Sequence, residues 1–433
     1  MDLLTILADQ KAELLSLDIH NLVERPEEHE IDLNSKFAQV VIGVRRCGKS
    51  TLCQKVLLES HVNFGYINFD DERLKDIDSD KFDDLLSTLY RLNGDFNYLF
   101  LDEIQNVNQW QLFVNRMLRQ GMHLIITGSN ANLLSSDLTT HLAGRYNEIE
   151  LFPFSFSEYC VAKKIDRSGY TTKDKALLQK ALDDYLQQGG FPEIVEGLAP
   201  RHYAANLIAT IVKKDVTLRY KVKYTDVLWK LTNTLLDNIC CVISASGLAE
   251  KLGVKSFHTV DRYVGFLQNA YLILALKKYS PKAIERKLRD KGYAIDMAFV
   301  NDHEDHLQSE GLGWRLENII AIELFRRIKT SGDELYYLEK NRGYDVDFVI
   351  TRRNKIKELI QVTYDFRNPS VKQYNREVGN LVKASKSLKC NNLKLIIMEG
   401  EEKEIEVDGC QVEIIKAVNW LLRLHSTPEP RER

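Results

Sequence analysis

The residues with the clearest chemical meaning form the run GVRRCGKS, from Gly43 to Ser50. This run matches the phosphate-binding (Walker A) pattern G-x-x-x-x-G-K-[ST] at every fixed position, and such a loop surrounds phosphates with backbone N–H groups. In the pattern Lys49 reaches the β- and γ-phosphates, the Ser50 hydroxyl ligates Mg²⁺, and Gly48 lets the backbone approach closely. An apolar run (37–42) precedes the loop and a helix-like run follows it, which is the context that an anion site requires. The sequence therefore predicts a nucleotide site that uses Mg²⁺.

The loop and the residue that follows it supply the predicted nucleotide contacts. These are Gly43, Val44, Arg45, Arg46, Cys47, Gly48, Lys49, Ser50 and Thr51. Arg45 and Arg46 either contact phosphate or an acidic partner, or lie behind the groups that do. Cys47 occupies a position that the pattern leaves open, so it is either a reactive thiol or a small residue that fills space.

A second group of candidate functional residues follows the short apolar run from Tyr98 to Leu101, where the acids Asp102 and Glu103 end a predicted strand. Ligands of parallel sheets bind at the carboxyl ends of the strands. Adjacent side chains at a strand end point in different directions, so one carboxylate can face a metal ion and the other a nucleophile. We therefore expect Asp102 to hold Mg²⁺, through water, and Glu103 to orient and deprotonate the attacking water, as a Walker B pair.

Two further positions complete a predicted catalytic set of Lys49, Glu103, Asn130 and Arg145. The strand HLIITGSN ends in Thr127, Ser129 and Asn130, and we expect Asn130 in particular to sense the γ-phosphate or to position water. A polar strand end or a helix cap is the alternative. Arg145 precedes the next strand and is either an arginine finger, in cis or in trans from a neighbouring subunit, or a salt-bridged residue at a strand start.

The composition excludes several classes of protein. The 433 residues are 44% hydrophobic and 28% charged, which is ordinary for a globular protein. No apolar run approaches the roughly 20 residues that span a bilayer. The N-terminal 30 residues lack the features of a secretory signal and instead predict an amphipathic helix. The seven Cys form no zinc or disulfide pattern, so we expect reduced thiols in a cytoplasmic protein with no membrane partner.

The charge is uneven along the chain. Residues 201–290 contain 16 Lys and Arg against 7 Asp and Glu, a local charge of +9 in a chain of net charge −3. Such a basic segment indicates either contact with nucleic acid or a solvated helical surface that pairs with acidic neighbours. Both interpretations remain open at this level.

Strand-like and helix-like runs alternate through the first third of the chain. Strands are predicted at residues 37–42, 64–72, 98–101, 123–130 and 146–151, with amphipathic helices between them. This alternation predicts an α/β fold with a doubly wound parallel sheet.

Taken together, the motifs resemble a known family. In chain order they are GVRRCGKSTL, YINFDDERL, YLFLDEIQN, IITGSNANLL, LAGRYNEIELFPFSFSEY and GGFPEIV. The chain is similar over nearly its whole length to bacterial and archaeal AAA-type P-loop ATPases that carry an endonuclease-like C-terminal domain of unknown function. This resemblance implies ATP as the nucleotide and a P-loop core followed by a small helical lid. In that lid, residues 189–193 form a turn near the nucleotide.

The middle of the chain fits a winged helix. Residues 243–280 read as helix, turn, second helix and strand pair, and the second helix repeats apolar residues at helical spacing. Lys255, His258 and Arg262 lie near the start of that helix, as in a helix that recognises the major groove of duplex DNA. The alternative is an element that contacts protein or forms part of the lid.

The C-terminal part resembles a restriction-endonuclease-like fold. Glu317 matches the helix acid of that pattern and Asp347 the strand acid, both of which would hold a metal ion. The next strand offers Gln361 and Thr363 where the pattern has an acid and a lysine, and neither neutral side chain fills those roles. We therefore expect a degenerate domain used for binding rather than an active metal-dependent nuclease.

These observations predict the organisation of the chain. The expected parts are a P-loop core with an N-terminal helix (1–155), a helical lid (156–220), a winged helix (221–295), an endonuclease-like domain (296–425) and a disordered tail (426–433). The expected function is Mg²⁺-dependent ATP hydrolysis that switches the conformation of the C-terminal domains. The alternatives are an ATP-regulated DNA-binding protein and a metal-dependent nuclease. An unidentified protein partner and an oligomer are both compatible with the sequence.

Overall fold

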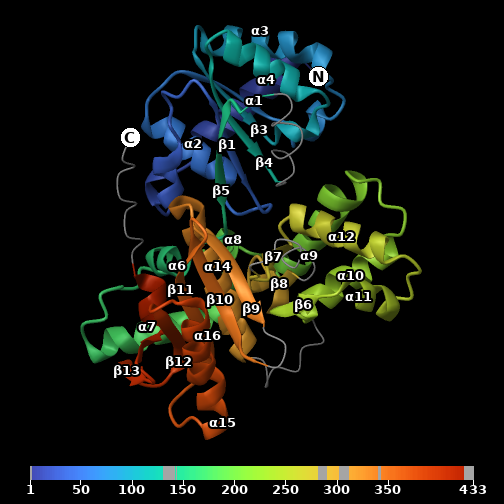
Figure 1. Cartoon of the computed structure of the whole chain (residues 1–433). Helices are drawn as coiled ribbons and strands as arrows, with labels where there is room; N and C mark the ends of the chain where they lie inside the picture. Colours follow the sequence, from blue (N-terminus) through green and yellow to red (C-terminus); the bar gives the residue numbers. More distant parts are fainter. Residues whose placement is uncertain are drawn as a thin grey trace. The chain divides into compact units, whose positions relative to one another are not determined.

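The computed structural model describes residues 2–129, 142, 144–280, 290–301, 312–339 and 343–423 (Figure 1). They divide into two compact units. The first lies within residues 1–153 and 269–271, and the second within 154–268 and 272–433. The predicted tail 426–433 lies outside the described residues.

The first unit is built on a parallel sheet. Its strands are β1 (Ala38–Gly43), β2 (Phe64–Asn68), β3 (Tyr98–Asp102), β4 (His123–Gly128) and β5 (Tyr146–Leu151). They lie in the order β2-β3-β4-β1-β5, and every neighbouring pair is parallel. The apolar runs form central strands because helices cover both faces of such a sheet. The predicted parallel sheet is therefore confirmed.

The register of this sheet aligns the carboxyl ends of its strands. Asn68 of β2 lies opposite Asp102 of β3, and Ile42 of β1 lies opposite Gly128 of β4. The glycine-containing loop after β1, the acids at the end of β3 and the polar residues at the end of β4 therefore emerge at one edge. This edge carries the candidate site.

Helices connect the strands of the first unit. They are α1 (Leu3–Leu15), α2 (Lys49–Glu59), α3 (Phe82–Asn93) and α4 (Trp110–Arg119), with short 3₁₀ turns at η1 (Ile19–Asn21), η2 (Pro26–Glu30), η3 (Glu72–Leu74), η4 (Ser79–Lys81) and η5 (Ile104–Asn106). The predicted N-terminal helix is α1, which buries Ile6, Leu7 and Leu14. Its Gln10 accepts a hydrogen bond from the Asn68 N–H (3.0 Å) and donates to the Asn68 carbonyl (3.1 Å). The helix therefore satisfies part of the backbone at the edge strand β2.

The second unit begins with a helical region. Its elements are α6 (Phe156–Ala162), α7 (Thr172–Gln188), α8 (Pro192–Val195), α9 (Tyr203–Thr210) and the π-helix η7 (Ile211–Leu218). The FSFSEY run begins α6 with a capping box. The Ser155 hydroxyl accepts from the Glu158 N–H (3.3 Å), and the Glu158 carboxylate accepts from the Ser155 N–H (2.6 Å). A local hydrogen-bond pair thus explains this part of the motif.

The GGFPE run forms a turn around a buried carboxylate. The Gly190 N–H donates to Asp296 Oδ2 (2.8 Å), and the Gly190 carbonyl accepts from the Phe154 N–H (2.7 Å). Gly189 has a φ of 78°, and a Cβ at this position would lie 1.7 Å from Asp296 Oδ1. Only glycine therefore fits this turn without displacing Asp296.

A helix-and-strand region follows in the chain. Its elements are α10 (Thr225–Asp237), β6 (Cys241–Ile243), α11 (Ala245–Lys251), α12 (Phe257–Asn269), β7 (Ile273–Lys277) and β8 (Asp290–Ala294). The three strands form an antiparallel sheet in the order β6-β8-β7 (Figure 1). Helix α12 buries Val260, Tyr263, Val264 and Leu267, the apolar residues at helical spacing noted in the sequence.

The last part of the second unit is a six-stranded mixed sheet with helices. The elements are α13 (Ala298–Asn301), α14 (Leu312–Ser331), β9 (Glu334–Glu339), β10 (Asp345–Arg352), β11 (Lys355–Asp365), α15 (Val371–Tyr374), the π-helix η9 (Asn375–Gly379), α16 (Asn380–Leu388), β12 (Leu393–Glu399), β13 (Lys403–Val407), β14 (Cys410–Lys416) and α17 (Ala417–Leu422). The strand order is β13-β14-β12-β11-β10-β9. Alternate strand residues such as Leu359 and Leu395 form one core with Leu381 of α16.

Two kinds of feature are absent from the residues that the structure describes. No helix there is long and apolar enough to cross a bilayer. No group of three or more His, Cys, Asp or Glu side chains there could hold a metal ion. All seven cysteines are described and are free thiols.

The turn around Asp296 predicts different costs for two glycine substitutions. Gly197 also has a positive φ, 77°, but a Cβ there would meet nothing within 4 Å. Gly197→Ala should therefore cost only the backbone penalty, about 1–2 kcal/mol. Gly189→Ala should cost at least about 2 kcal/mol more, because its methyl group would displace Asp296. Urea unfolding followed by Trp fluorescence measures both. Equal losses would contradict the packing described for this turn.

Candidate functional site

The glycine-containing loop joins β1 directly to α2. Gly43 ends the strand with a φ of 149°, and a Cβ there would lie 2.0 Å from the Leu151 carbonyl oxygen. Gly48 precedes Lys49, the first residue of the helix, in the left-handed conformation with a φ of 100°. Both fixed glycines of the pattern thus occupy positions that disfavour a side chain. The backbone N–H groups at the start of α2 carry the positive end of the helix dipole, which suits an anion.

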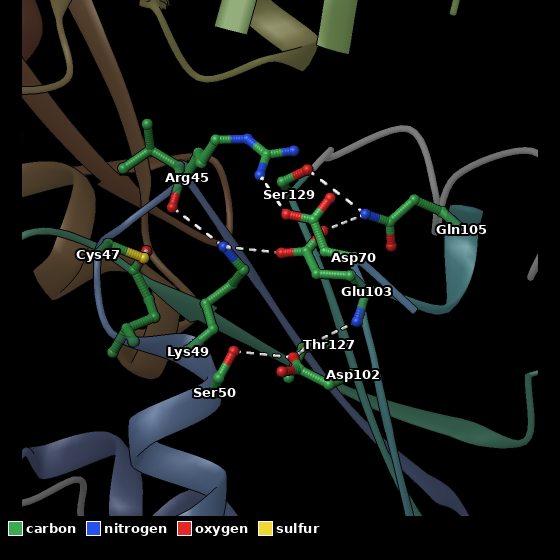
Figure 2. Close-up of polar contacts among 12 residues, drawn as sticks. Arg45, Cys47, Lys49, Ser50, Asp70, Asp102, Glu103, Gln105, Thr127 and Ser129 are labelled. Carbon is green, nitrogen blue, oxygen red and sulfur yellow. Dashed lines mark hydrogen bonds and ion pairs between the residues drawn. The ribbon is translucent and has the colours of Figure 1, made fainter. Parts of the chain in front are cut away.

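Lys49 lies between the loop and the acids of β3. Its side chain is buried, with 4% exposed, and its Nζ donates to the Val44 carbonyl (3.1 Å). The same ammonium lies 3.8 Å from Glu103 Oε1 (Figure 2). A buried ammonium needs such partners because desolvation of an unpaired charge is costly. The lysine is therefore held at the place where the pattern requires phosphate contacts.

Two hydroxyl groups donate hydrogen bonds to Asp102 Oδ1, and the Tyr66 hydroxyl donates to Oδ2 (3.5 Å). The Ser50 hydroxyl donates to Asp102 Oδ1 over 2.8 Å, and the Thr127 hydroxyl donates to the same oxygen (Figure 2). Burial, followed by the neighbouring charge of Glu103, raises the pKa of Asp102 to about 6, although the two hydroxyls oppose this shift. Carboxylate and hydroxyl oxygens are the ligands that Mg²⁺ prefers. The donor set of Ser50 and Asp102 therefore fits the magnesium ion expected from the sequence.

Glu103 follows β3 in a left-handed backbone conformation. Its φ is 51° and its ψ is 40°, which is uncommon for a residue other than glycine. Its N–H donates to the Thr127 hydroxyl oxygen (3.0 Å), while its carboxylate accepts from the Gln105 amide and faces Lys49. The two adjacent acids thus have different partners, with Asp102 directed at Ser50 and Glu103 at Lys49.

The other loop residues contact the surrounding protein in different ways. Arg45 Nη1 lies 3.2 Å from Asp70 Oδ2, so this arginine does meet an acid (Figure 2). Arg46 adopts a φ of 67°, and Thr51 is half-buried in the first turn of α2. The Cys47 thiol is buried, donates to the Leu151 carbonyl (3.3 Å), and has a pKa raised by burial. These properties fit a space-filling residue, since reactive thiols are exposed and partly ionised.

The structure places only part of the predicted catalytic set at this edge. Lys49 and Glu103 meet there, whereas Asn130 lies outside the described residues. Arg145 is exposed and precedes β5, and its carbonyl accepts from the N–H of Ala38 at the start of β1. The loop follows the opposite end of β1, roughly 17 Å away at the usual rise of a strand. The structure therefore does not bring Arg145 to the loop of its own chain.

Two residues near the loop were not identified from the sequence. Arg25 is buried and donates through Nη2 to the Phe152 carbonyl (2.8 Å) and through Nη1 to the Cys47 carbonyl (3.4 Å). Gln105 donates to the Glu103 carboxylate. The sequence signals are weak. Arg25 is marked only by the Pro that follows it, and Gln105 only by its position two residues after Glu103. Neither position belongs to the phosphate-loop pattern.

The acids predicted in the second unit also lie together. Lys291 Nζ of β8 lies 2.6 Å from Glu317 Oε1 and 3.9 Å from Asp347 Oδ1. The hydroxyl of Tyr293 donates to Glu317 (2.9 Å), and the Val362 N–H donates to Asp347 (2.9 Å). Burial and the charge of Glu317 raise the pKa of Asp347, while Lys291 opposes this shift. The two carboxylates are thus balanced by an ammonium group that the sequence pattern did not include.

The neutral residues of the next strand lie beside this cluster. The Asp347 N–H donates to the Gln361 amide oxygen (3.3 Å), and the Gln361 amide donates to Glu377 (2.9 Å). Thr363 is buried on the same strand, β11. Gln361 therefore links Asp347 to a third carboxylate through hydrogen bonds rather than acting as an acid itself.

Comparison with known proteins assigns families to two parts of the chain. A family model described as an AAA domain matches residues 35–160, which include the phosphate loop and the acids of β3. A second model, described as a domain of unknown function (DUF8612), matches residues 179–308. The Walker-type ATPase of Pyrococcus abyssi is a similar solved structure, with 14% identity and a TM-score of 0.43. The match covers 65% of this chain and 96% of that chain.

Two curated relatives are similar over almost their whole length. An uncharacterized protein of Methanocaldococcus jannaschii is 33% identical over 95% of this chain and 92% of its own length. An uncharacterized protein of Haemophilus influenzae is 31% identical over 90% of this chain and 95% of its own length. The chain therefore belongs to the family of these archaeal and bacterial proteins, and it carries an AAA-type P-loop ATPase domain.

Proposed function

We propose that this protein is a Mg²⁺-dependent ATPase whose nucleotide state switches the conformation of the rest of the chain. One observation carries the proposal. Lys49 and Ser50 of the phosphate loop meet Asp102 and Glu103 at a single edge of the parallel sheet. Loop, hydroxyl and two differently directed acids are the parts that P-loop hydrolases use. The match of residues 35–160 to an AAA domain supports ATP rather than GTP as the nucleotide.

Each residue then has a distinct role. The loop N–H groups and Lys49 would bind the phosphates, and Ser50 and Asp102 would hold the metal ion. Mg²⁺ supplies positive charge that offsets the negative charge of the phosphates. Glu103 orients a water molecule and accepts its proton as the water oxygen bonds to the γ-phosphorus. The bond from that phosphorus to the β–γ bridging oxygen breaks, and the products are ADP and inorganic phosphate.

The proposed switch starts from the partners of Lys49. The Lys49 ammonium is close to Glu103 in the structure. Phosphate binding would draw this ammonium away from Glu103. The balance of charge at the ends of β1 and β3 would then change. Strand β5 is hydrogen-bonded to β1 and continues into α6 after four residues. Residues 156–220 therefore follow, after four residues, a strand that is paired with the strand preceding the loop. We propose that they act as the lid. A cytoplasmic location fits this use of ATP.

Two substitutions separate nucleotide binding from hydrolysis. Lys49→Ala should weaken ATP binding by at least 10-fold, because the loop loses its only side-chain ammonium for the phosphates. Glu103→Gln should retain binding and lower kcat by about 100-fold or more, because the general base is removed. Phosphate release and fluorescent-nucleotide binding measure the two effects. Glu24→Gln, an exposed acid of the same unit, is the control. Parent-like hydrolysis by Glu103→Gln would disprove the assigned base.

Duplex DNA is a second candidate ligand. The order α10, β6, α11, α12, β7, β8 with the sheet β6-β8-β7 is that expected of a winged helix. Lys255, His258 and Arg262 are exposed before and on α12, within the segment of charge +9. These features support a role for α12 in the major groove. A protein partner for the same helix is the competing proposal.

DNA binding through α12 should depend on salt. The affinity for duplex DNA should fall steeply between 50 and 200 mM salt, because phosphate contacts release counterions. Arg262→Gln should weaken binding and reduce the slope of log affinity against log salt by about one. Lys173→Gln, an exposed lysine of α7, should change neither. Fluorescence anisotropy measures the affinities. No binding at low salt, with or without nucleotide, would exclude this candidate.

For the six-stranded sheet we propose an endonuclease-like fold that serves binding. The placement of Glu317 and Asp347 together supports the resemblance. Lys291 balances both acids, and Gln361 and Thr363 are neutral, so the chain's own groups favour a binding surface over hydrolysis of a phosphodiester. A protein partner and an oligomer, to which Arg145 could contribute in trans, remain part of this proposal.

A further inference from the structure

Gln105 lies beside the acid that we propose as the general base. It belongs to the short turn η5, which follows Glu103 directly. Its amide nitrogen donates to Glu103 Oε2 and lies 3.4 Å from the hydroxyl oxygen of Ser129 at the end of β4 (Figure 2). The amide therefore connects the carboxylate after β3 with a polar group after β4.

The carboxylate of Glu103 is held from two sides. Gln105 binds Oε2, and Lys49 Nζ lies 3.8 Å from Oε1. Only 12% of the Glu103 side chain is exposed, so water competes weakly for either oxygen. The two holders differ in one respect, because Lys49 is also the residue that phosphates would attract. The neutral amide of Gln105 would not be drawn to the phosphates in this way.

The orientation of the Gln105 amide is fixed by its acidic neighbour. An ionised carboxylate only accepts hydrogen bonds, so the NH₂ group must face Glu103. The other amide atom, Oε1, is buried and has no hydrogen-bond donor among the described residues. A buried acceptor without a donor is unfavourable. The bond to Glu103 is thus formed although the amide oxygen is left without a donor among the described residues.

We propose that Gln105 is a positioning residue for Glu103. It keeps the carboxylate beside the phosphate loop when Lys49 turns to the phosphates, so that the base stays aligned with the attacking water. This inference rests on the proposed ATPase function and deepens it. Gln105 acts through Glu103 and touches neither ATP nor Mg²⁺ in this role.

Two variants of Gln105 test the proposal in the full-length protein. Gln105→Met keeps the length of the side chain and removes the donor. Gln105→Glu keeps the shape and places a like charge beside Glu103. Both should lower kcat, Gln105→Met by about 10- to 100-fold, while KM and the Kd for ATP stay within about twofold of the parent. Gln120→Met, at an exposed site after α4, should leave all three unchanged.

A double-mutant cycle separates positioning from a structural effect. In the Glu103→Gln background, Gln105→Met should change the residual rate by less than about twofold, because the group that it positions is already gone. An equal loss of kcat in both backgrounds, or a KM that rises in step with the loss, would overturn the proposal. So would a parent-like kcat for Gln105→Met.

The same experiment distinguishes failure of the underlying function. If the parent protein hydrolyses no ATP, or if Glu103→Gln alone hydrolyses at the parent rate, the ATPase assignment fails and the role of Gln105 falls with it. If Glu103 proves essential and Gln105 dispensable, only the positioning role is wrong. Thermal unfolding midpoints of the variants show whether a loss of rate reflects loss of the fold.

Discussion

The parallel register of β1, β3 and β4 is the constraint on which the site depends. Strands that run in one direction deliver their carboxyl ends to one edge, so residues separated by more than fifty positions in the chain become neighbours. The loop after β1, the acids of β3 and Thr127 of β4 meet for this reason. The same constraint requires a helix after each strand, and α2 is the helix whose first residue is Lys49.

Charge balance shapes the site as strongly as topology does. Lys49 and Asp102 are both almost fully buried, and each is stabilised by groups of the protein itself. Buried charges without partners would destabilise the fold. Under the proposed function, a phosphate ligand at this edge would therefore exchange partners with Lys49, which already has partners in the protein.

The sequence was sufficient for the parts of the site with fixed spacing. The loop from Gly43 to Ser50 and the acid pair could be placed because each follows an apolar strand. Arg25 could not be foreseen, since its contacts span 22 and 127 positions of the chain and depend on how side chains pack. The role of Lys291 could not be predicted for the same reason. Its charge is meaningful only because β8 lies near Glu317.

Arg145 illustrates a different gap between sequence and structure. The sequence shows that Arg145 precedes a strand, but it does not show at which edge of the sheet that strand begins. Because β5 runs parallel to β1, its first residue must lie at the amino edge of the sheet, away from the loop. The direction of a strand, as well as its presence, therefore decides whether a nearby charge can reach a ligand.

The segment around Arg25 has a consequence for how this protein could be divided. Arg25 supports the loop from behind, and Glu28 pairs with Lys55 of α2 over 2.7 Å. Both residues precede position 35, where the match to the AAA domain begins. The region that matches the AAA domain and the compact unit of the structure therefore have different borders. A fragment cut at the border of the module would lose two of the side chains that hold its own loop and first helix in place.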